Sequence, residues 1–173
     1  IPDGVLLVEG ETIAAVGKRG EVAIPKGAEI IDLKGKFLFP GLVCTHSHVG
    51  KVQGGDGSSP IQPGVRVLDS IDVLDSTLEK ARAGGITMAN LMSGSGHLLS
   101  GQTAYLKLRD GVTVEELALR NEDGSMAGGI KMANGTNPQH QTTAKTNTMS
   151  ADTNPNTNAF CFVIVLRLSL IHI

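Results

Sequence analysis

A short apolar segment that follows a Pro-Gly pair and ends in two histidines constrains the fold most strongly. It runs from Phe39 to Val43 and continues through Cys44 to His46 and His48. Its apolar character predicts a buried strand, and the Pro-Gly pair marks a break near its start. In an extended backbone, side chains two residues apart point to the same side, so both imidazoles can face one point. This position resembles the strand end at which α/β barrels place catalytic groups.

The two histidines favour a metal site. Neutral imidazole is a good ligand for zinc and similar divalent metals, and two imidazoles supply half of a tetrahedral shell. A metal held there with an open position can activate water near neutral pH. The pattern therefore predicts that His46 and His48 bind a divalent metal, with zinc as the expected ion. The alternative is a chance His-x-His pair without a metal, because short motifs match by accident.

Several segments resemble the amidohydrolase superfamily. Pro40-Gly41-Leu42 leading into His46-Ser47-His48 is similar to its first-strand signature, and residues 5–17 and 29–36 match as well. The segments that resemble the imidazolonepropionase-like branch are 83–87, 94–97 and 100–102. The resemblance implies a metal-dependent hydrolase that cleaves carbon–nitrogen bonds other than peptide bonds in a small-molecule substrate such as a cyclic amide. It also implies a TIM-type (β/α) barrel beside a small β-sandwich, and allows a homo-oligomer in the full-length protein.

The predicted fold class is therefore α/β, and the first segment is expected to be part of the β-sandwich. This segment comprises residues 1–38. Two strands within 4–17 flank the turn at Glu9-Gly10-Glu11. Two further short strands are predicted at 29–33 and 36–39. In the hairpin, one inward face is expected to carry Val5, Leu7, Ile13 and Ala15.

Residues 39–137 are expected to form the first part of the barrel. The Gly-, Ser- and Pro-rich stretch 49–63 predicts a loop, which either covers the substrate or is a simple insertion. A helix is predicted over 72–85, with Asp72 as its N-cap and the glycine pair at its end. Strands follow at 86–91 and 104–108, and a Thr-x-x-Glu capping box predicts a short helix from 113 to 119. A strand, a helix and a second strand in this order predict two parallel strands.

The glycine-rich loop after strand 86–91 contains His97 and leads to Gln102. Its spacing does not fit a phosphate-binding loop or a dinucleotide fingerprint. As a wall of the active site, it would let His97 or Gln102 donate a hydrogen bond to a substrate carbonyl. The alternative is a turn that leaves His97 in solvent, and for His97 we favour this alternative.

Lys131 lies in a glycine-flanked segment, 128–135, that resembles the same family branch. Many amidohydrolases bridge two metals with a carbamylated lysine on a later strand. We expect Lys131 instead to be a solvated surface side chain, since lysines are rarely buried. Its position in the chain is also early for the bridging strand.

Residues 138–173 are predicted to be a low-complexity and apolar tail that is disordered or non-native. Residues 138–158 are mostly Thr, Asn, Gln, Ala and Ser, a composition typical of disorder. The apolar run 160–173 is too short and too charged to span a membrane, and instead has the character of an aggregation-prone β segment.

Composition excludes several function classes. A net charge of -2 and a pI near 6.2 provide no basic surface for nucleic acid. One Tyr, four Phe and no Trp leave few side chains to stack on bases. Cys44 and Cys161 do not form a disulfide framework, and Cys44 is expected to be a small buried hydrophobe. Without a secretion signal in the sequence we expect a cytoplasmic location and no membrane partner.

The catalytic acid or base stays unassigned. In the family, later strands supply further histidines and an aspartate, whereas here the histidines after His48 are His97, His140 and His172. We therefore expect the chain to be a hydrolase fragment that is inactive by itself. The alternative function is a non-catalytic scaffold or oligomerisation protein with the same fold. Retention of both His46 and His48 favours the hydrolase, because a scaffold has no physical need for them.

Overall fold

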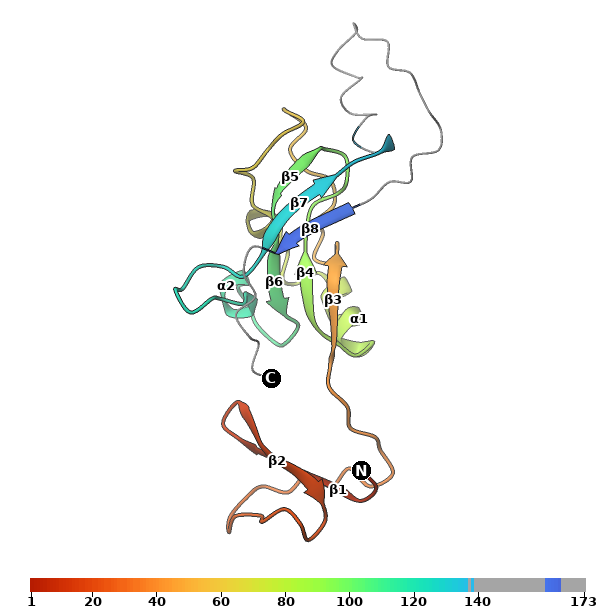
Figure 1. Ribbon diagram of the computed structural model, residues 1–173, viewed down its shortest axis with the longest axis vertical. Coiled ribbons are helices and arrows are strands. Elements are labelled where there is room, and N and C mark those ends of the chain that lie inside the picture. The colour runs from red at the N-terminus through yellow and green to blue at the C-terminus, as the bar shows by residue number, and fades with distance from the viewer. Residues whose placement is uncertain (137, 139–160, 166–173) are drawn as a thin grey trace, which may run out of the picture. The chain divides into compact units, whose positions relative to one another are not determined.

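The computed structural model describes residues 1–136 and 138, together with the backbone of 161–165. The chain divides into two compact units, one of residues 1–39 and one that begins at Pro40. The described residues form a mixed α/β structure with three small sheets and two short α-helices (Figure 1). No helix in this described part has the length and apolar character needed to cross a bilayer.

The first unit contains the predicted hairpin. Strand β1 (Gly4–Glu9) pairs antiparallel with β2 (Thr12–Lys18). Gly10 lies in the connecting turn with a φ of +60°, a conformation that glycine adopts without steric cost. The alternation of apolar residues and the turn glycine are local signals, which is why the sequence predicts this element correctly.

The predicted inward face of the hairpin is correct for three of its four residues. Val5, Leu7 and Ala15 are half-buried, whereas Ile13 is 47% exposed. The register shifts between Leu7 and Val8, so that Leu7 pairs with Ala15 but Val8 pairs with Ile13. A bulge of this kind moves the following residues to the other face, and it removes Ile13 from the inward side.

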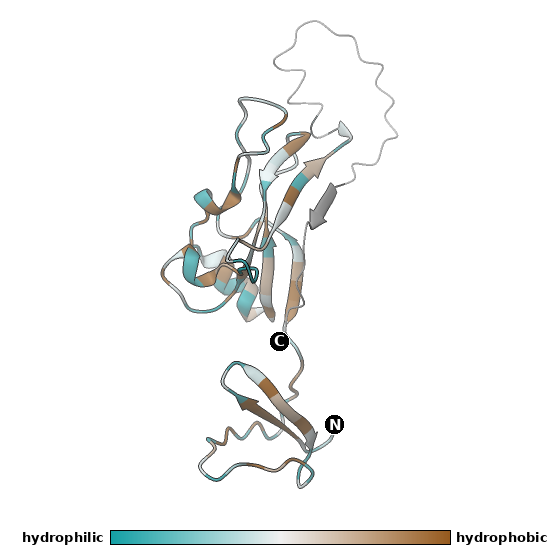
Figure 2. Cartoon of the chain, turned by 60° about the vertical axis from the view of Figure 1, so that its left-hand side comes forward, coloured by the Kyte–Doolittle hydropathy of each residue, from teal (hydrophilic) through white to brown (hydrophobic). Residues whose placement is uncertain are grey.

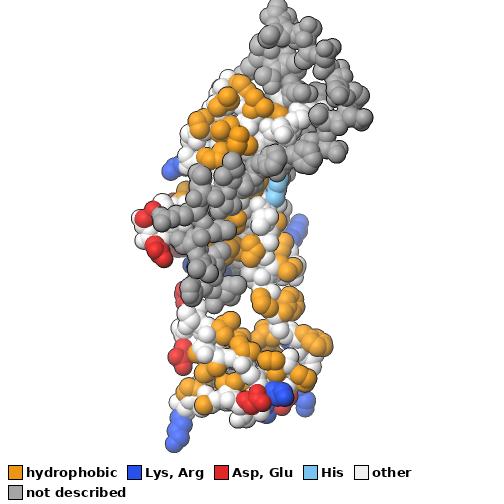
Figure 3. All heavy atoms as spheres, viewed as in Figure 1, with side chains coloured by type: hydrophobic (Ala, Val, Ile, Leu, Met, Phe, Trp, Pro, Cys, Tyr) orange, Lys and Arg blue, Asp and Glu red, His pale blue; other side chains and the backbone are white. Residues whose placement is uncertain are grey.

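The predicted strands at 29–33 and 36–39 are wrong, because this stretch forms no regular structure apart from one turn. Its apolar side chains are largely in solvent, with Ile30 76% and Phe37 95% exposed. Figure 3 shows many hydrophobic side chains on the surface of the first unit. A strand requires a neighbour to pair with, and no described strand lies beside this stretch, so its β propensity is not realised.

The second unit contains the predicted pair of parallel strands. Strand β3 (Leu42–Ser47) pairs parallel with β4 (Ile86–Leu91), and β6 (Ala104–Lys107) adds to β4 in the antiparallel direction. Between β3 and β4 the chain passes through the predicted irregular loop, the 3₁₀ helix η1 (Val67–Ser70) and helix α1 (Ser76–Ala83). The strand, helix and strand order thus produces the parallel pairing that was expected.

Helix α1 is shorter than predicted and begins four residues later. Asp75 is its N-cap and accepts a hydrogen bond from the backbone N–H of Thr77. Asp72, the predicted cap, instead accepts from the backbone of Leu74 and binds Lys51 at 2.8 Å. Both aspartates satisfy the cap pattern, and Lys51 lies near both of them, 2.8 Å from Asp72 and 3.9 Å from Asp75. The helix ends at Gly84, as the glycine pair predicts.

One face of the β3–β4–β6 sheet packs against α1 through the main core. Leu78 of α1 joins Ala89 and Leu91 of β4 and Leu106 of β6 there, and each of these side chains is nearly or fully buried. We call this side the helix-facing face. The residues that alternate with them, Met88 and Asn90 of β4 and Tyr105 of β6, point to the opposite side, which we call the inner face. In Figure 2 apolar colour follows the strands, while α1 carries much of the hydrophilic colour.

A second three-stranded sheet completes the unit. Strand β7 (Gly129–Ala133) lies between β5 (Leu99–Gln102) and β8 (Cys161–Val165), and both pairings are antiparallel. Helix α2 (Val114–Leu117) begins with the predicted capping box, formed by Thr113 and Glu116. Strand β8 lies within the apolar run 160–173, for which β character was predicted, and it adds five residues to the edge of β7. The other tail residues, 139–160 and 166–173, lie outside the described residues.

Candidate functional site

A bulge in β3 determines which way the two histidines point. Cys44 pairs with Ala89 and Ser47 pairs with Leu91, so three residue steps on β3 match two steps on β4. Cys44 packs against the core of the helix-facing face, as expected for a small apolar side chain. The extra residue breaks the alternation after Cys44 and turns both imidazoles away from that core.

The structure brings the rings of His46 and His48 together. Their Nε2 atoms are 3.3 Å apart, and the ring centroids are 5.1 Å apart with the planes at 85°. His46 is exposed and His48 is half-buried, so the two nitrogens can be reached from solvent. The expectation that the imidazoles converge on one point is consistent with this geometry.

A hydrogen bond to the backbone holds the His48 ring. Its Nδ1 lies 2.7 Å from the backbone carbonyl oxygen of Met92, in the segment that continues β4. A carbonyl oxygen can only accept, so Nδ1 carries the proton and donates it to Met92. The Nε2 atom of neutral His48 therefore keeps its lone pair, which is the tautomer that a metal ligand needs.

Lys131 of β7 lies against the histidine pair, which corrects the expectation of a solvated surface lysine. Its side chain is fully buried, with Nζ 3.4 Å from His46 Nε2 and 3.7 Å from Met92 Sδ. Partial burial lowers the pKa of His46, and the nearby charges of Lys131 and His48 lower it further. This burial was not predicted from the sequence, although an isolated lysine between apolar neighbours in a short strand is a pattern compatible with it.

The donor atoms fit a zinc-like metal in type and spacing. Two nitrogens that each lie 2.0–2.1 Å from a tetrahedral zinc are separated by about 3.3–3.4 Å, and the two Nε2 atoms are 3.3 Å apart. Among the described residues, no group of three or more His, Cys, Asp or Glu side chains could hold a metal. The fit therefore concerns two imidazole ligands, with the Lys131 amine as a third nitrogen beside them.

His97 is buried, so the preferred expectation that it lies in solvent is wrong. Its side chain is 5% exposed, and its Nε2 has no hydrogen-bond partner in the described part of the chain. The loop that carries it folds against the loop after β3 through a hydrogen bond from Gly94 N to Gly54 O. Packing between these two loops, which local sequence does not encode, removes His97 from water.

Gln102 lies at the end of β5 with its side chain exposed. Its Nε2 donates to the carbonyl oxygen of Pro63 at 3.3 Å. In the described part of the chain, no hydrogen bond joins Gln102 or His97 to the histidine pair. The structure thus groups His46, His48 and Lys131, and leaves the other two predicted residues outside that group.

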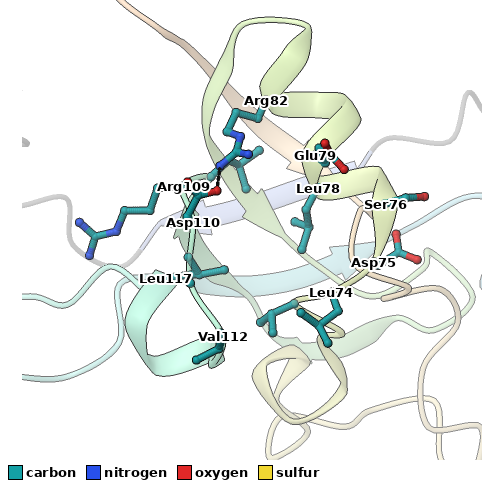
Figure 4. Close-up of a pocket in the computed structure, with 13 residues that line it drawn as sticks. Leu74, Asp75, Ser76, Leu78, Glu79, Arg82, Arg109, Asp110, Val112 and Leu117 are labelled. Carbon is teal, nitrogen blue, oxygen red and sulfur yellow. Dashed lines mark hydrogen bonds and ion pairs between the residues drawn. The ribbon is translucent and has the colours of Figure 1, made fainter.

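A separate pocket of about 420 Å³ lies between α1 and the segment that follows β6 (Figure 4). Leu78, Leu108 and Leu117 contribute apolar side chains to it, and Arg82 binds Asp110 across it at 2.5 Å. None of the predicted site residues lines this pocket, which belongs to the helix-facing side. Its lining residues are Val73, Leu74, Asp75, Ser76, Leu78, Glu79, Arg82, Leu108, Arg109, Asp110, Gly111, Val112 and Leu117.

The chain is similar to several proteins of known name, although no model of a known protein family matches it. An imidazolonepropionase from Pseudomonas paraeruginosa is 34% identical over 123 residues, which are 68% of this chain and 28% of that protein. Amidohydrolase tasK from Hapsidospora irregularis is 30% identical over 114 residues, or 60% of this chain and 12% of that protein. A 5-methylthioadenosine/S-adenosylhomocysteine deaminase from Bacillus cereus is 48% identical over 50 residues, or 28% and 11% of the two chains.

A solved structure shows the same relationship. An amidohydrolase from Thermotoga maritima superposes with a TM-score of 0.70 and 34% sequence identity, over 81% of this chain and 37% of that one. The chain spans less than a third of the length of the imidazolonepropionase, 28%. Sequence and structure agree on one relationship, and the chain is therefore a relative of the amidohydrolase superfamily, similar within it to the imidazolonepropionases.

Proposed function

We propose that the chain belongs to a metal-dependent hydrolase that cleaves a non-peptide or cyclic amide C–N bond, with His46 and His48 as metal ligands. The observation that supports this most is the 3.3 Å separation of their Nε2 atoms, with the His48 ring held by Met92. The named relatives are hydrolases and a deaminase, which act on C–N bonds. When bound, a divalent metal would polarise the substrate carbonyl and lower the pKa of water.

The parallel pair β3 and β4 supports a further part of the proposal, that the second unit is the beginning of a TIM-type barrel. His46 lies at the carboxyl end of β3 and His48 directly follows it, and the loop with His97 follows the carboxyl end of β4. Barrel enzymes bind small-molecule substrates at that edge. His97 and Gln102 are the proposed substrate-binding residues there, through hydrogen bonds to a carbonyl oxygen.

The Lys131 amine bears on the metal proposal, because it lies beside the histidine pair. A protonated amine 3.4 Å from His46 Nε2 would repel a divalent cation. A neutral amine could bind the cation or react with carbon dioxide, forming an N–C bond and releasing a proton. The product is a carbamate anion, which attracts the cation. Because Lys131 is buried beside the pair, we propose this carbamate in place of a solvated lysine.

Metal analysis of the intact chain tests the proposal. We expect about one equivalent of zinc per chain, lost in the His46→Ala/His48→Ala variant and kept in His97→Ala, a matched histidine outside the pair. A chain that folds and takes up no metal would favour the alternative, a non-catalytic scaffold of the same fold.

Isotope labelling tests the Lys131 carbamate separately. Carbon-13 bicarbonate should give a carbamate signal in the nuclear magnetic resonance spectrum of the zinc-loaded chain. The signal should be absent from Lys131→Gln and present in Lys107→Gln, a lysine of the neighbouring strand β6. A spectrum without the signal in the wild-type chain would reject the carbamate and leave the histidine ligands in place.

A further inference from the structure

The chain directly after His48 adopts an unusual backbone conformation. Gly50 and Lys51 both have positive φ angles, 78° and 61°. A positive φ costs glycine little, whereas a lysine rarely adopts it unless the surrounding structure holds it there. We therefore expect contacts from outside the segment to hold this bend at residues 49–51.

Residues 72–77, which lead into α1 and form its first turn, supply those contacts. The backbone N–H of Gly50 donates to Thr77 Oγ1 at 2.9 Å, and the Gly50 carbonyl oxygen accepts from the backbone N–H of Asp72 at 3.0 Å. The Lys51 ammonium lies 2.8 Å from Asp72 Oδ2. Gly50 is buried, so its peptide groups have little access to water and depend on these partners.

Thr77 is the side chain that connects the Gly50 backbone to the helix. Its hydroxyl accepts from Gly50 and donates to Asp75, the N-cap of α1, so it is used both as acceptor and as donor. Thr77 is exposed and does not belong to the core of the helix-facing face, so apolar packing does not account for it. A valine would fill the same space and leave the Gly50 N–H without this acceptor.

The His48 ring needs a fixed backbone in addition to its hydrogen bond with Met92. That hydrogen bond fixes one ring atom, Nδ1, at 2.7 Å from the Met92 carbonyl oxygen. The ring can still pivot about this contact when the His48 backbone moves. Its Nε2 atom, which faces His46, would then change position. The separation of the two Nε2 atoms therefore depends on the bend that follows His48 as well as on Met92.

We propose that Thr77 is a positioning residue for the metal site, and that it keeps His48 Nε2 at the distance from His46 that zinc requires. Thr77 acts through the Gly50 peptide and not as a ligand. The inference rests on the proposed function and gives His48 a second support beside Met92. Replacing an outer partner of a metal-binding histidine typically weakens metal binding about 10–100-fold. Because Thr77 acts through the backbone, we expect a loss at the lower end, about tenfold.

Zinc titration of the full chain tests this role with three variants. Thr77→Val removes the hydroxyl and keeps the branched shape, Thr77→Ser keeps the hydroxyl, and Thr113→Val removes the capping hydroxyl of α2. Zinc should bind Thr77→Val about tenfold more weakly than the wild-type chain. It should bind the other two variants with the wild-type affinity. Unchanged affinity in Thr77→Val, or an equal loss in Thr113→Val, would overturn the inference.

Two measurements on the metal-free chain do not depend on the metal proposal. A nuclear Overhauser contact should join the ring protons beside the two Nε2 atoms, which are 3.3 Å apart. This contact should weaken in Thr77→Val and persist in Thr113→Val, and wild-type strength in Thr77→Val would overturn the inference. The Gly50 amide should exchange slowly with solvent in the wild-type chain. Rapid exchange there would overturn the inference even if Thr77→Val does not fold.

The role of Thr77 and the metal site can fail separately. Zinc uptake by the wild-type chain, with the same affinity in Thr77→Val, rejects the role of Thr77 and keeps the histidine ligands. A folded wild-type chain that takes up no zinc rejects the metal site. The contact between the two histidine rings then decides whether Thr77 positions His48.

Discussion

The two faces of the β3–β4–β6 sheet differ in whether the polar groups on them have hydrogen-bond or ion-pair partners. The helix-facing face is apolar, with Leu78, Leu91 and Leu106 packed together, and the polar groups around it are paired. Asp75 caps α1, Thr113 and Glu116 cap α2, and Arg82 binds Asp110. The inner face and the adjoining strand end hold Asn90, without a hydrogen-bond partner in the described part, and the cluster of His46, His48 and Lys131.

The difference indicates that the two faces serve different purposes. Buried polar groups cost stability unless they are paired, and proteins keep such arrangements mainly at functional sites. Substitutions on the helix-facing face should therefore change stability and leave metal and ligand binding intact. Substitutions in the histidine cluster should change metal binding, and replacement of the buried Asn90 amide should not lower stability. Each of the following predictions tests one side of this contrast.

Truncation of Leu106 should have the largest effect on stability. Leu106 is fully buried in the core of the helix-facing face. Leu106→Ala should lower the free energy of unfolding by about 2–5 kcal/mol, since it leaves a cavity as well as removing apolar contact. Urea denaturation measures this change. The folded fraction of the variant should keep the zinc content of the wild-type chain. A loss of zinc from the folded variant would contradict the claim that the two faces serve different purposes.

Replacement of Asn90 should have a smaller effect of opposite sign. Asn90→Leu removes a buried amide that has no partner among the described residues, and should raise the free energy of unfolding by about 1–3 kcal/mol. Asn121→Leu is the matched control, because the Asn121 amide donates to Ser125 Oγ at 2.9 Å and its loss should destabilise the chain. Destabilisation by both substitutions would mean that the Asn90 amide is structural.

Removal of the α2 cap should cost about 1 kcal/mol, the usual value for an N-cap threonine. Thr113 Oγ1 accepts from the backbone N–H of Glu116, and Thr113→Ala leaves that donor without its cap. Glu115→Ala, in the same turn and exposed, should change the free energy of unfolding by less than about 0.5 kcal/mol. Thermal unfolding compares the two variants, and equal effects would show that the capping box contributes nothing.

Acid should slightly lower the free energy of unfolding of the metal-free chain, because His46 becomes protonated. The pKa of His46 is lowered from its ordinary value of 6.5, so between the two values the unfolded chain binds more protons than the folded chain. The contribution of His46 to the free energy of unfolding is therefore fully present above pH 6.5, and it is lost as the pH falls through the lowered pKa. Unfolding measured from neutral pH downward should show a shallower fall in His46→Ala. An identical pH profile would mean that His46 is not perturbed by its neighbours.

Local signals in the sequence predicted much of the fold. The turn at Gly10, the apolar strand 86–91 and the capping box at Thr113 each depend on residues near one another in the chain, and each is present. The strands expected at 29–33 and 36–39 failed because pairing requires a distant partner. Asp75 rather than Asp72 is the helix cap, and Asp72 binds the distant Lys51.

The sequence predicted only part of the candidate site, because the rest depends on contacts between distant segments. His46 and His48 are neighbours in the chain, and their spacing along a strand predicts that their rings meet. Lys131 lies on a strand 85 residues away from His46, and the pattern of apolar and polar residues along the sequence does not predict a contact over that separation. The burial of His97 and Asn90 also depends on packing between segments that are separate in sequence.

X-ray absorption of the zinc-loaded chain tests the central claim most directly, because it reports the atoms around the metal. The account predicts scattering from imidazole nitrogens at about 2.0–2.1 Å from zinc, and loss of this contribution in His46→Ala/His48→Ala. Zinc surrounded only by oxygen, or an imidazole contribution that persists in the double variant, would contradict it.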